Sequence, residues 1–494
     1  MDRSWPEAFL QDSRTLWIVG AIVAVLFLIT NLPWQLDDYD QAKQAFTSFE
    51  MVKEGHWLYQ RTPHERVATK PPLVAWISAG FFEATRSWDI AWRLPPLLAA
   101  VAILILLFRS AKSAYGLPAG IVALSAFSLN LLTPRLATLV RTDMPLALVI
   151  LLIGLLIWRK IRDGAPWNSR DRLFMFVLLT AGMLIKGPIV YAFLLPGIAF
   201  FEWWRRKSGG VSGWCGWWPW LASLAIFLAW ALGGTKFVPG FYDQVVVREF
   251  MGRFGETIHR PQPIYFYWPH LLHKFAPWSV LMILLAIVAA RSGGNRFRDT
   301  LKRISPDTVW LICWSLGGLL VMSIIPSKRV DRIFPVLPPL CLLLAAQFGS
   351  LVASERLGQR IYRWVAVAVA FSVVFTGAYT AFKVVSGYRE RRDALVRFGG
   401  AVREQAAAHQ WRYEAISGSD EGMLLYLQRT HFIERQRAVP EWNLGNLDAL
   451  VVPADQAEGY MRDLRNSSTS ALRSTKREAE RDGYVLLIRQ GSGD

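Results

Sequence analysis

Cysteine is scarce in this sequence. The chain has three cysteines among 494 residues, and each lies in or beside an apolar run: Cys215, Cys313 and Cys341. Their spacing matches neither a disulfide framework nor a zinc site, in which ligands recur at short, fixed intervals. We therefore expect these side chains to pack among apolar neighbours, and we do not expect a disulfide-stapled secreted domain.

Other signatures are missing as well. The sequence shows no internal repeat, no low-complexity tract and, after residue 383, no glycine-rich phosphate loop. Repeated halves are frequent in secondary transporters, so their absence favours an enzyme over a transporter. Acidic residues are also few, since 38 Asp and Glu face 55 Lys and Arg, a net charge of +17. The basic residues are dispersed among loops between apolar runs, which indicates membrane topology and not nucleic-acid binding.

Apolar residues dominate the chain. Its 53% hydrophobic content and 23 tryptophans are outside the range of an ordinary soluble enzyme. About 20 helical residues cross a bilayer. Eleven runs approach or exceed that length, near residues 15–33, 89–108, 115–133, 144–158, 173–185, 188–204, 214–234, 277–290, 308–326, 333–353 and 364–382. The sequence therefore predicts an α-helical polytopic membrane protein with about 11–13 membrane helices.

The basic clusters predict which loops share a side of the membrane. They occupy every second loop, as in WRKIRDGAPWNSRDR and RSGGNRFRDTLKR. The positive-inside rule makes those loops cytoplasmic and places the C-terminus on the outer side. The chemically rich loops then face outward.

The chain divides into a membrane domain over 1–382 and a soluble domain over 383–494. In the first outer loop, 34–88, the stretch 39–53 has helical periodicity and ends at Gly55, which predicts a helix along the membrane surface. Its apolar face holds Ala42, Ala45, Phe46, Phe49 and Val52. PPLVAWISAGFFEA is too short for a confident span and is interpreted as a second interfacial helix.

The C-terminal domain is expected to be a small α/β domain on the outer, periplasmic face. It begins with a helix-like stretch, YRERRDALVRFGGAVREQAAAH. Strand-like pieces follow in YEAISG, MLLYLQ, ALVVP and YVLLIRQ.

The outer loops hold more basic residues than the positive-inside rule favours. These are Lys70, Arg135, Arg141, Lys186, Arg248, Arg253, Arg260, Lys274, Lys328, Arg329 and Arg332. A sugar carried on a lipid phosphate would account for them, because its phosphate leaving group needs cations. The acceptor hydroxyl would need a carboxylate base. The outer loops supply acids at Asp37, Asp38, Asp40 and Asp143.

Structural interpretations compete with these roles. Acids at a helix N-terminus are stabilised by its dipole without catalysing anything, and Lys70 can reach lipid headgroups as a surface lysine. Asp143 can pair with Arg141 or Arg135, and Lys186 can simply end a helix. Lys328 and Arg329 can form a solvated charge cluster with Asp331 and Arg332, and His259 can be a surface histidine.

An ordered set of motifs resembles one family. DQAKQAFTSFEMVKEGHWL, TKPPLVAW, LVRTDMPLAL, GMLIKGP, RPQPIYFYWPHLL, APWS and PSKRVDRIFPVLPPL follow one another over roughly residues 15–350. The series resembles the GT-C membrane glycosyltransferases. It is most similar to the branch with lipid A aminoarabinose transferases, lipopolysaccharide-core galacturonosyltransferases and protein O-mannosyltransferases.

The resemblance implies roles for individual residues. The family's catalytic base opens the first interfacial helix, and counting back from Glu50, Met51, Gly55 and Trp57 points to Asp40. Asp143 corresponds to the acid that orients the acceptor or the base. Donor phosphate would be bound by Lys70, Arg141, Lys186, Lys328 and Arg329. Secondary candidates are Asp37, Asp38, Arg253, His259 and Tyr265.

Two departures from the family pattern bear on metal and substrate. Relatives often have Glu before the Lys-Pro pair, proposed to hold a metal with a later histidine. Here the position is Thr69, although His259 is present, so this departure disfavours a divalent metal without removing it as an alternative. The Arg-Tyr pair usual after the catalytic acid is replaced by Lys43 and Gln44, which leaves the sugar and the acceptor open.

The resemblance and the charge pattern together predict an inverting glycosyltransferase in the bacterial inner membrane. It would move a sugar from a polyprenyl-phosphate donor to lipid A, lipopolysaccharide core or another envelope glycan on the periplasmic side. We expect membrane lipids but no nucleic acid among its partners. Two alternatives are a transporter or flippase of lipid-linked sugars and a protein O-mannosyltransferase.

Overall fold

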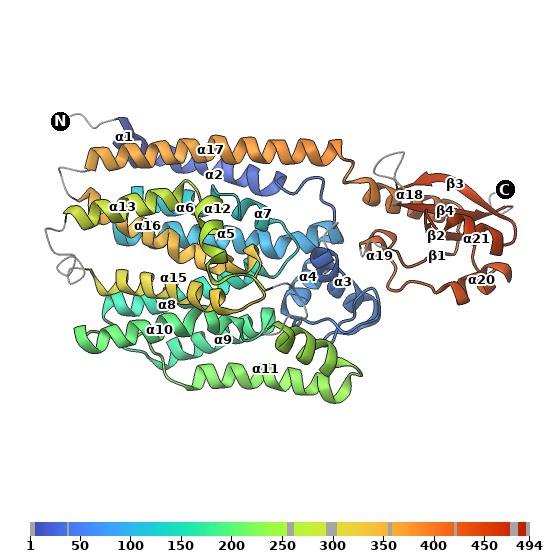
Figure 1. Ribbon diagram of the computed structural model, residues 1–494, viewed down its shortest axis with the longest axis horizontal. Helices are drawn as coiled ribbons and strands as arrows, with labels where there is room; N and C mark the ends of the chain where they lie inside the picture. The colour runs from blue at the N-terminus through green and yellow to red at the C-terminus, as the bar shows by residue number, and fades with distance from the viewer. Residues whose placement is uncertain are drawn as a thin grey trace. The chain divides into compact units, whose positions relative to one another are not determined.

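The computed structural model describes residues 5–36, 39–253, 261–292, 304–353, 358–418, 422–474 and 483–490. The chain forms two compact units (Figure 1). The helical unit comprises Met1–Thr30, Thr69–Val74 and Arg93–Thr380. The mixed unit comprises Asn31–Ala68, Ala75–Trp92 and Ala381–Asp494. The mixed unit thus joins the C-terminal segment with two parts of the first outer loop.

Long helices make up most of the helical unit. Those that lie wholly or mainly in it are α1 Trp5–Gln11, α2 Ser13–Ile29, α5 Trp88–Tyr115, α6 Leu117–Ser128, α7 Thr133–Ala137, α8 Asp143–Asp163, α9 Ser169–Lys186, α10 Ile189–Ser208, α11 Trp218–Phe237, α12 Tyr267–Lys274, α13 Trp278–Ser292, α15 Pro306–Ile324, α16 Leu337–Val352 and α17 Gly358–Arg389. Short π and 3₁₀ segments add η1 Tyr242–Phe250, η2 Met251–Arg253, η3 Ile264–Phe266 and η4 Val330–Val336.

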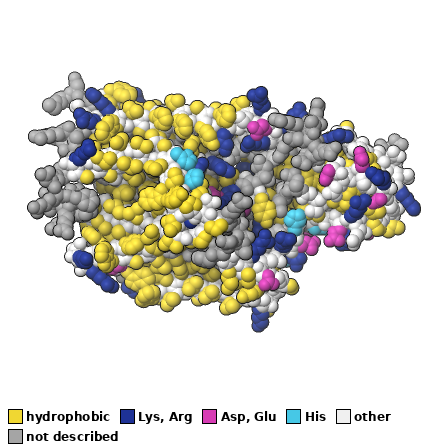
Figure 2. Space-filling view, viewed as in Figure 1, with side chains coloured by type: hydrophobic (Ala, Val, Ile, Leu, Met, Phe, Trp, Pro, Cys, Tyr) yellow, Lys and Arg dark blue, Asp and Glu magenta, His cyan; other side chains and the backbone are white. Residues whose placement is uncertain are grey.

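The predicted class, a helical membrane protein with a small C-terminal sheet, is confirmed. By length and composition, the described residues contain six candidate membrane spans, or up to eight if two bent helix pairs each count as one. The sequence predicted eleven to thirteen. The difference arises partly because α6 has 12 residues, and because α9 and α10 carry charged residues at their ends. Hydrophobic side chains cover most of the visible face of the helical unit (Figure 2).

Small residues bring three helices of this unit into close contact. A Cβ on Gly317 of α15 would lie 2.5 Å from the backbone nitrogen of Gly197 on α10, and a Cβ on Gly154 of α8 would lie 2.1 Å from the Trp314 ring. Trp310 of α15 also donates a hydrogen bond to the Gly154 carbonyl at 3.1 Å. Glycine permits such contacts because backbones can approach without a side chain between them. The packing fixes α8 and α10 against α15.

The mixed unit combines two helices of the first long loop with the C-terminal sheet. Its helices are α3 Tyr39–Glu54, α4 Leu73–Thr85, α18 Ala394–Ala408, α19 Met423–Leu427, α20 Arg435–Asn443 and α21 Ala457–Asp463. Its strands are β1 Tyr413–Ala415, β2 Ala449–Pro453, β3 Ser467–Arg473 and β4 Tyr484–Arg489. The sheet order is β1-β2-β4-β3, with β1 parallel to β2 and the other pairs antiparallel.

The two interfacial helices are confirmed as helices. α3 spans the predicted range and buries the predicted apolar face, with Ala42, Ala45, Phe46 and Phe49 almost wholly inaccessible. Gly55 ends the helix at φ +80°, a conformation that glycine adopts without strain. Periodicity alone therefore located the element that carries the candidate base.

Two of the four stretches that were predicted to be strands form strands over nearly their whole length. β2 and β4 match ALVVP and YVLLIRQ and are almost fully buried, and YEAISG contains the shorter β1. The prediction of a strand in MLLYLQ was wrong, because Met423–Leu427 forms the helix α19, with all five residues buried. A short, continuously apolar run has no period that distinguishes a buried strand from a buried helix.

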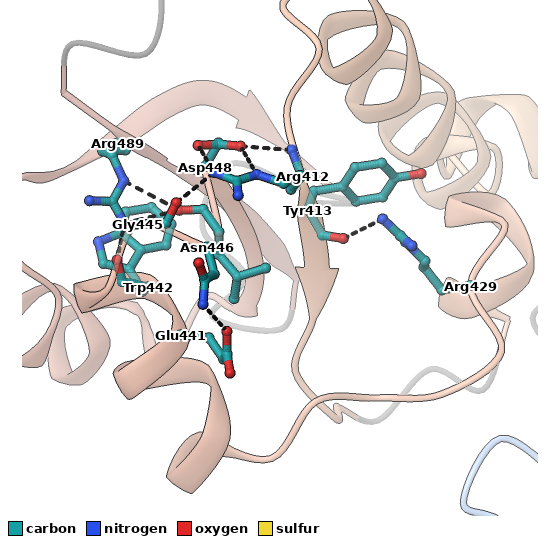
Figure 3. A network of polar contacts seen from close by, with 10 residues as sticks. Arg412, Tyr413, Arg429, Glu441, Trp442, Gly445, Asn446, Asp448 and Arg489 are labelled. Carbon is teal, nitrogen blue, oxygen red and sulfur yellow. Dashed lines mark hydrogen bonds and ion pairs between the residues drawn. The ribbon is translucent and has the colours of Figure 1, made fainter.

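Arginines hold the ends of the sheet together (Figure 3). Arg412 donates two hydrogen bonds to the Asp448 carboxylate, at 2.9 and 3.1 Å, just before β2 begins. Arg489 donates to the carbonyl oxygens of Trp442 and Leu447 and lies over the Trp442 ring. These bonds tie the segment before β1 and the end of β4 to the segment that runs from the end of α20 to β2.

The first loop and the C-terminal segment are joined inside the mixed unit. The Leu36 backbone N–H donates to the Tyr426 hydroxyl at 2.6 Å, and the Thr430 hydroxyl donates to Glu54 of α3 at 2.5 Å. These bonds join residues nearly 400 positions apart in the chain. The helix α3 thus packs within the same unit as the C-terminal sheet.

Candidate functional site

A buried asparagine shapes the segment that leads into α8. The Asn130 side chain accepts hydrogen bonds from the backbone N–H groups of Leu132 and Thr133 at 2.8 and 2.9 Å, and it donates to the carbonyl of Phe127. Trp278 donates to the Leu129 carbonyl at 2.8 Å. This bonding satisfies buried backbone groups in a segment without regular structure. It fixes the start of α7, which precedes the segment with Arg141 and Asp143.

Asp143 and Lys186 form an ion pair where α8 begins and α9 ends. Their Oδ1 and Nζ atoms lie 2.5 Å apart, and the side chains are only 8% and 11% exposed. An acid in the first turn and a lysine in the last turn each complement the dipole of their helix. Because α8 and α9 are packed neighbours that run in opposite directions, these two termini meet. The sequence alternative paired Asp143 with Arg141 or Arg135. In the structure, Asp143 pairs with Lys186 instead.

Asp331 links two predicted phosphate-binding arginines. Its carboxylate pairs with Arg141, from the segment before α8, and with Arg329 at 3.0 Å. The positive charges of Arg329, Arg141 and Lys186 all act on this carboxylate. The two ion pairs therefore form one electrostatic group, assembled from the ends of α8 and α9 and the start of η4.

Lys328 has a different kind of partner. Its ammonium group donates to the backbone carbonyl of Gln262 at 2.8 Å, while the side chain is 5% exposed. Burial lowers the pKa of Lys328 below its ordinary value because the charged form loses hydration. Arg332 lies nearby in the chain and donates to the carbonyl of Ser327 at 2.7 Å. The alternative of a solvated charge cluster does not hold for Lys328, whose side chain is buried.

We call this group the basic cluster. Its members are Arg141, Lys186, Lys328, Arg329 and Arg332 with the acids Asp143 and Asp331. Its formal charge is +3. Because an excess of positive charge in a partly buried group is costly, such a group is suited to bind an anion.

The other residues predicted in the helical unit are more dispersed. Lys70 is half-buried just before α4, and Tyr265 is exposed on η3. Arg253 ends η2, and its side chain lies outside what the structure describes. Asp37, Asp38 and His259 also lie outside the described residues. The structure thus brings together Arg141, Asp143, Lys186 and Arg329, with Lys328 next to Arg329 in the chain, and their roles stay predictions.

Asp40 belongs to the mixed unit. It lies half-buried in the first turn of α3, a position in which acidic side chains complement the helix dipole. Within the described ranges, no three His, Cys, Asp or Glu side chains gather closely enough to hold a metal ion.

Glu50, on the same helix, is a buried acid to which the sequence gave no role of its own. It pairs with His56 Nδ1 and accepts a hydrogen bond from the Arg61 backbone N–H at 3.2 Å. These contacts bind the turn after α3 back to the helix. Burial raises the pKa of Glu50 above its ordinary value of 4.5, against the lowering effect of these two partners.

We expect Glu50→Gln to gain stability relative to the unchanged protein as pH rises from about 4.5 towards 7. The folded state holds the Glu50 proton more tightly than the unfolded chain, so the unchanged protein loses stability as pH rises through the raised pKa. Glutamine does not titrate. Thermal unfolding midpoints of both proteins in detergent across this pH range measure the difference. A difference that stays flat or falls would contradict the burial argument.

Asp331 is the residue of the cluster to which the sequence assigned no catalytic or binding role. It appeared only in the alternative of a solvated charge cluster. Its pairing with Arg141 joins positions 190 residues apart, which no local pattern indicates.

Comparisons with known proteins point to one family. Residues 69–232 match the family described as dolichyl-phosphate-mannose-protein mannosyltransferase. The undecaprenyl phosphate-alpha-4-amino-4-deoxy-L-arabinose arabinosyl transferase of Shewanella sediminis is 26% identical over 69% of this chain. A protein of the same description from Sodalis glossinidius is 25% identical over 68% of this chain. The chain spans only 62% and 60% of the length of these two relatives.

Solved structures share the fold. ArnT from Cupriavidus metallidurans, bound to undecaprenyl phosphate, superposes with a TM-score of 0.69 over 97% of this chain and 99% of its own, at 17% identity. The archaeal oligosaccharyltransferase AglB from Archaeoglobus fulgidus gives a TM-score of 0.51 over 90% of this chain and 70% of its own, at 12% identity. The chain therefore has the GT-C fold.

Proposed function

We propose that this chain, a member of the GT-C glycosyltransferases by its fold and its similarities, is an inverting enzyme that uses a polyprenyl-phosphate sugar. The observation that carries the proposal is the basic cluster. It presents five cations and two acids where α8 begins and α9 ends, and so offers a net positive charge to a phosphate. A polyprenyl phosphate is the leaving group that such a cluster would stabilise.

Within the cluster, Lys328 is the residue we assign most directly to the donor phosphate. Arg141, Lys186 and Arg329 each pair with a carboxylate, whereas the described partner of Lys328 is a neutral carbonyl. A phosphate oxygen near Lys328 would offset the loss of hydration that lowers its pKa. Asp143 and Asp331 pair with three of the other cations and fix their positions.

The proton transfer is assigned to Asp40. As base, it would take the proton of the acceptor hydroxyl while that oxygen attacks the anomeric carbon of the sugar. The bond from the anomeric carbon to the phosphate oxygen breaks in the same step, and polyprenyl phosphate leaves as an anion. One direct displacement inverts the configuration at that carbon.

The charge distribution of the helical unit supports a periplasmic site. α8 and α10 end with basic residues, namely Lys160, Arg162, Arg205, Arg206 and Lys207, at the end of these helices away from the basic cluster. The positive-inside rule assigns that end to the cytoplasm. The cluster would then face the periplasm of a bacterial inner membrane, where envelope glycans are modified.

We expect Lys328→Gln to weaken binding of polyprenyl phosphate by roughly 10- to 100-fold, because a hydrogen bond to a charged group is worth about 1.5–3 kcal/mol. Competition against a fluorescent polyprenyl phosphate in detergent measures the dissociation constant. Lys160→Gln is the control, since Lys160 is a largely inaccessible lysine, 12% exposed, that pairs with Asp171 at 2.5 Å at the other end of α8. Equal affinities for the two variants would remove Lys328 from the phosphate site.

Transfer itself is tested with a donor labelled in both the sugar and the lipid. A transferase releases free polyprenyl phosphate and moves the sugar to an acceptor in detergent, where there are no sides to cross. A transporter or flippase leaves the donor intact. The position of the described charges at helix ends favours the enzyme, because transporters place such groups near the bilayer midplane.

The acceptor is proposed to be lipid A, lipopolysaccharide core or another envelope glycan, in keeping with the arabinosyl transferase relatives. A protein acceptor is the alternative, because residues 69–232 match a family described as protein mannosyltransferases. Mass spectrometry of lipid A, core oligosaccharide and envelope proteins from a deletion strain distinguishes them. The fraction that loses a sugar identifies the acceptor class.

A further inference from the structure

A surface cavity in the mixed unit lies outside the basic cluster. Its volume is about 410 Å³, within the range of small-ligand sites. One wall is a face of α18, where the small residues Ala394 and Ala401 leave room beside Phe398. The other wall is the end of β3, with Leu472. α18 and β3 pack against each other in the structure (Figure 1).

Three arginines give this cavity a positive charge. Arg391, Arg397 and Arg473 line it, and Arg397 pairs with Asp393 at 3.0 Å. Among the described residues, no acidic side chain pairs with Arg391 or Arg473. With Asp393 counted, the cavity carries a formal charge of +2. Its lining therefore combines apolar side chains with a net positive charge.

The cavity also lies close to the end of a candidate membrane span. α17 qualifies as a span by length and composition and ends at Arg389, two residues before Arg391. Two residues of chain reach at most about 7 Å. Phe382, Val385 and Tyr388, on the last turns of α17, are largely exposed. Exposed apolar residues followed by a tyrosine mark the level of the lipid headgroups.

We propose that this cavity binds the phosphate headgroup of an anionic membrane phospholipid. Arg391 and Arg473 would contact the phosphate, and Phe398 and Leu472 would contact the glycerol and the start of the acyl chains. The position of the cavity indicates this ligand, because headgroup phosphates are concentrated at this depth of the membrane. The site goes beyond the proposed glycosyl transfer and does not depend on it, since anionic phospholipids occur in both leaflets.

The test is a titration of the purified full-length chain in detergent with fluorescent phosphatidylglycerol and, separately, fluorescent phosphatidylcholine. The variant is Arg391→Gln with Arg473→Gln, two exposed residues whose exchange removes no buried group and leaves the Arg397–Asp393 pair intact. The control is Arg403→Gln with Arg462→Gln, which removes the same charge from exposed positions outside the cavity.

The expected result is a loss of phosphatidylglycerol affinity of at least tenfold for the cavity variant, from about fivefold for each arginine at an anionic surface. The control should change by less than twofold, and phosphatidylcholine binding should not change in either. Equal losses in both variants would show general charge attraction and overturn the site. An unchanged cavity variant would overturn it as well.

A second arm separates a lipid headgroup from soluble phosphate. Inorganic phosphate is added at constant ionic strength, with chloride as the reference. Retention of phosphatidylglycerol supports a lipid site, since the apolar walls contribute to binding. Complete displacement at millimolar phosphate would instead show a site for a free anion and contradict the proposal.

Discussion

Asp40→Asn should lower sugar transfer by about 10²- to 10⁴-fold while the protein stays folded, because a general base contributes a factor of this size. Asp40 lies in the first turn of α3, where its carboxylate is stabilised by the helix dipole. Asparagine has the same shape and is also favoured near a helix start, but it cannot accept the proton of the acceptor hydroxyl. The measurement is release of free polyprenyl phosphate from labelled donor in the presence of acceptor.

Two comparisons make this result decisive. Binding of polyprenyl phosphate should be unchanged in Asp40→Asn, since the donor phosphate is assigned to the basic cluster. Asp37→Asn removes an acid of the same stretch and should retain transfer within about tenfold. Full transfer by Asp40→Asn would refute the assignment, and loss in Asp37→Asn alone would move the base to that position.

Asp331→Asn should lower the free energy of unfolding by about 3–5 kcal/mol, because it leaves Arg141 and Arg329 partly buried without their shared carboxylate. Asp163→Asn is the matched control. Asp163 is 55% exposed and pairs with Arg162 at 3.2 Å, so its loss should cost no more than about 1 kcal/mol. Denaturant titration in mixed micelles measures both values.

The same variant reports on anion binding. Without Asp331 the cluster gains a positive charge, so polyprenyl phosphate should raise the unfolding midpoint of Asp331→Asn more than that of the unchanged protein. Stabilisation by a ligand grows with its affinity for the folded state. An equal or smaller shift in the variant would indicate that the phosphate binds away from Arg141 and Arg329.

The elements that were predictable from sequence are those with a clear period. The apolar positions of α3 recur at helical spacing, and Gly55 follows the last turn, so range and buried face were both correct. β2 and β4 are apolar, β-branched runs between polar segments. By contrast, β3 reads SSTSALR and alternates between half-exposed and exposed positions. A polar edge strand lacks the apolar alternation on which strand prediction depends.

The candidate site was likewise only partly predictable from the sequence. Motif order identified Arg141, Asp143, Lys186 and Arg329, which the structure brings into one cluster. The pairing of Asp143 with Lys186 and of Arg141 with Asp331 depends on helix packing over 43 and 190 residues. The sequence shows which charged residues need partners, but only the folded structure shows which of them pair.

The hydrogen bond from Leu36 to the Tyr426 hydroxyl has a consequence for biogenesis. It joins positions 390 residues apart, so the unit that contains α3 cannot be completed until almost the whole chain has been made. At about 5–20 residues per second, the ribosome needs roughly 20–80 s to cover that distance. The contacts of α3 with the C-terminal segment therefore form late in synthesis, whereas its contacts with α4 and with Trp88, within the next 50 residues, can form early.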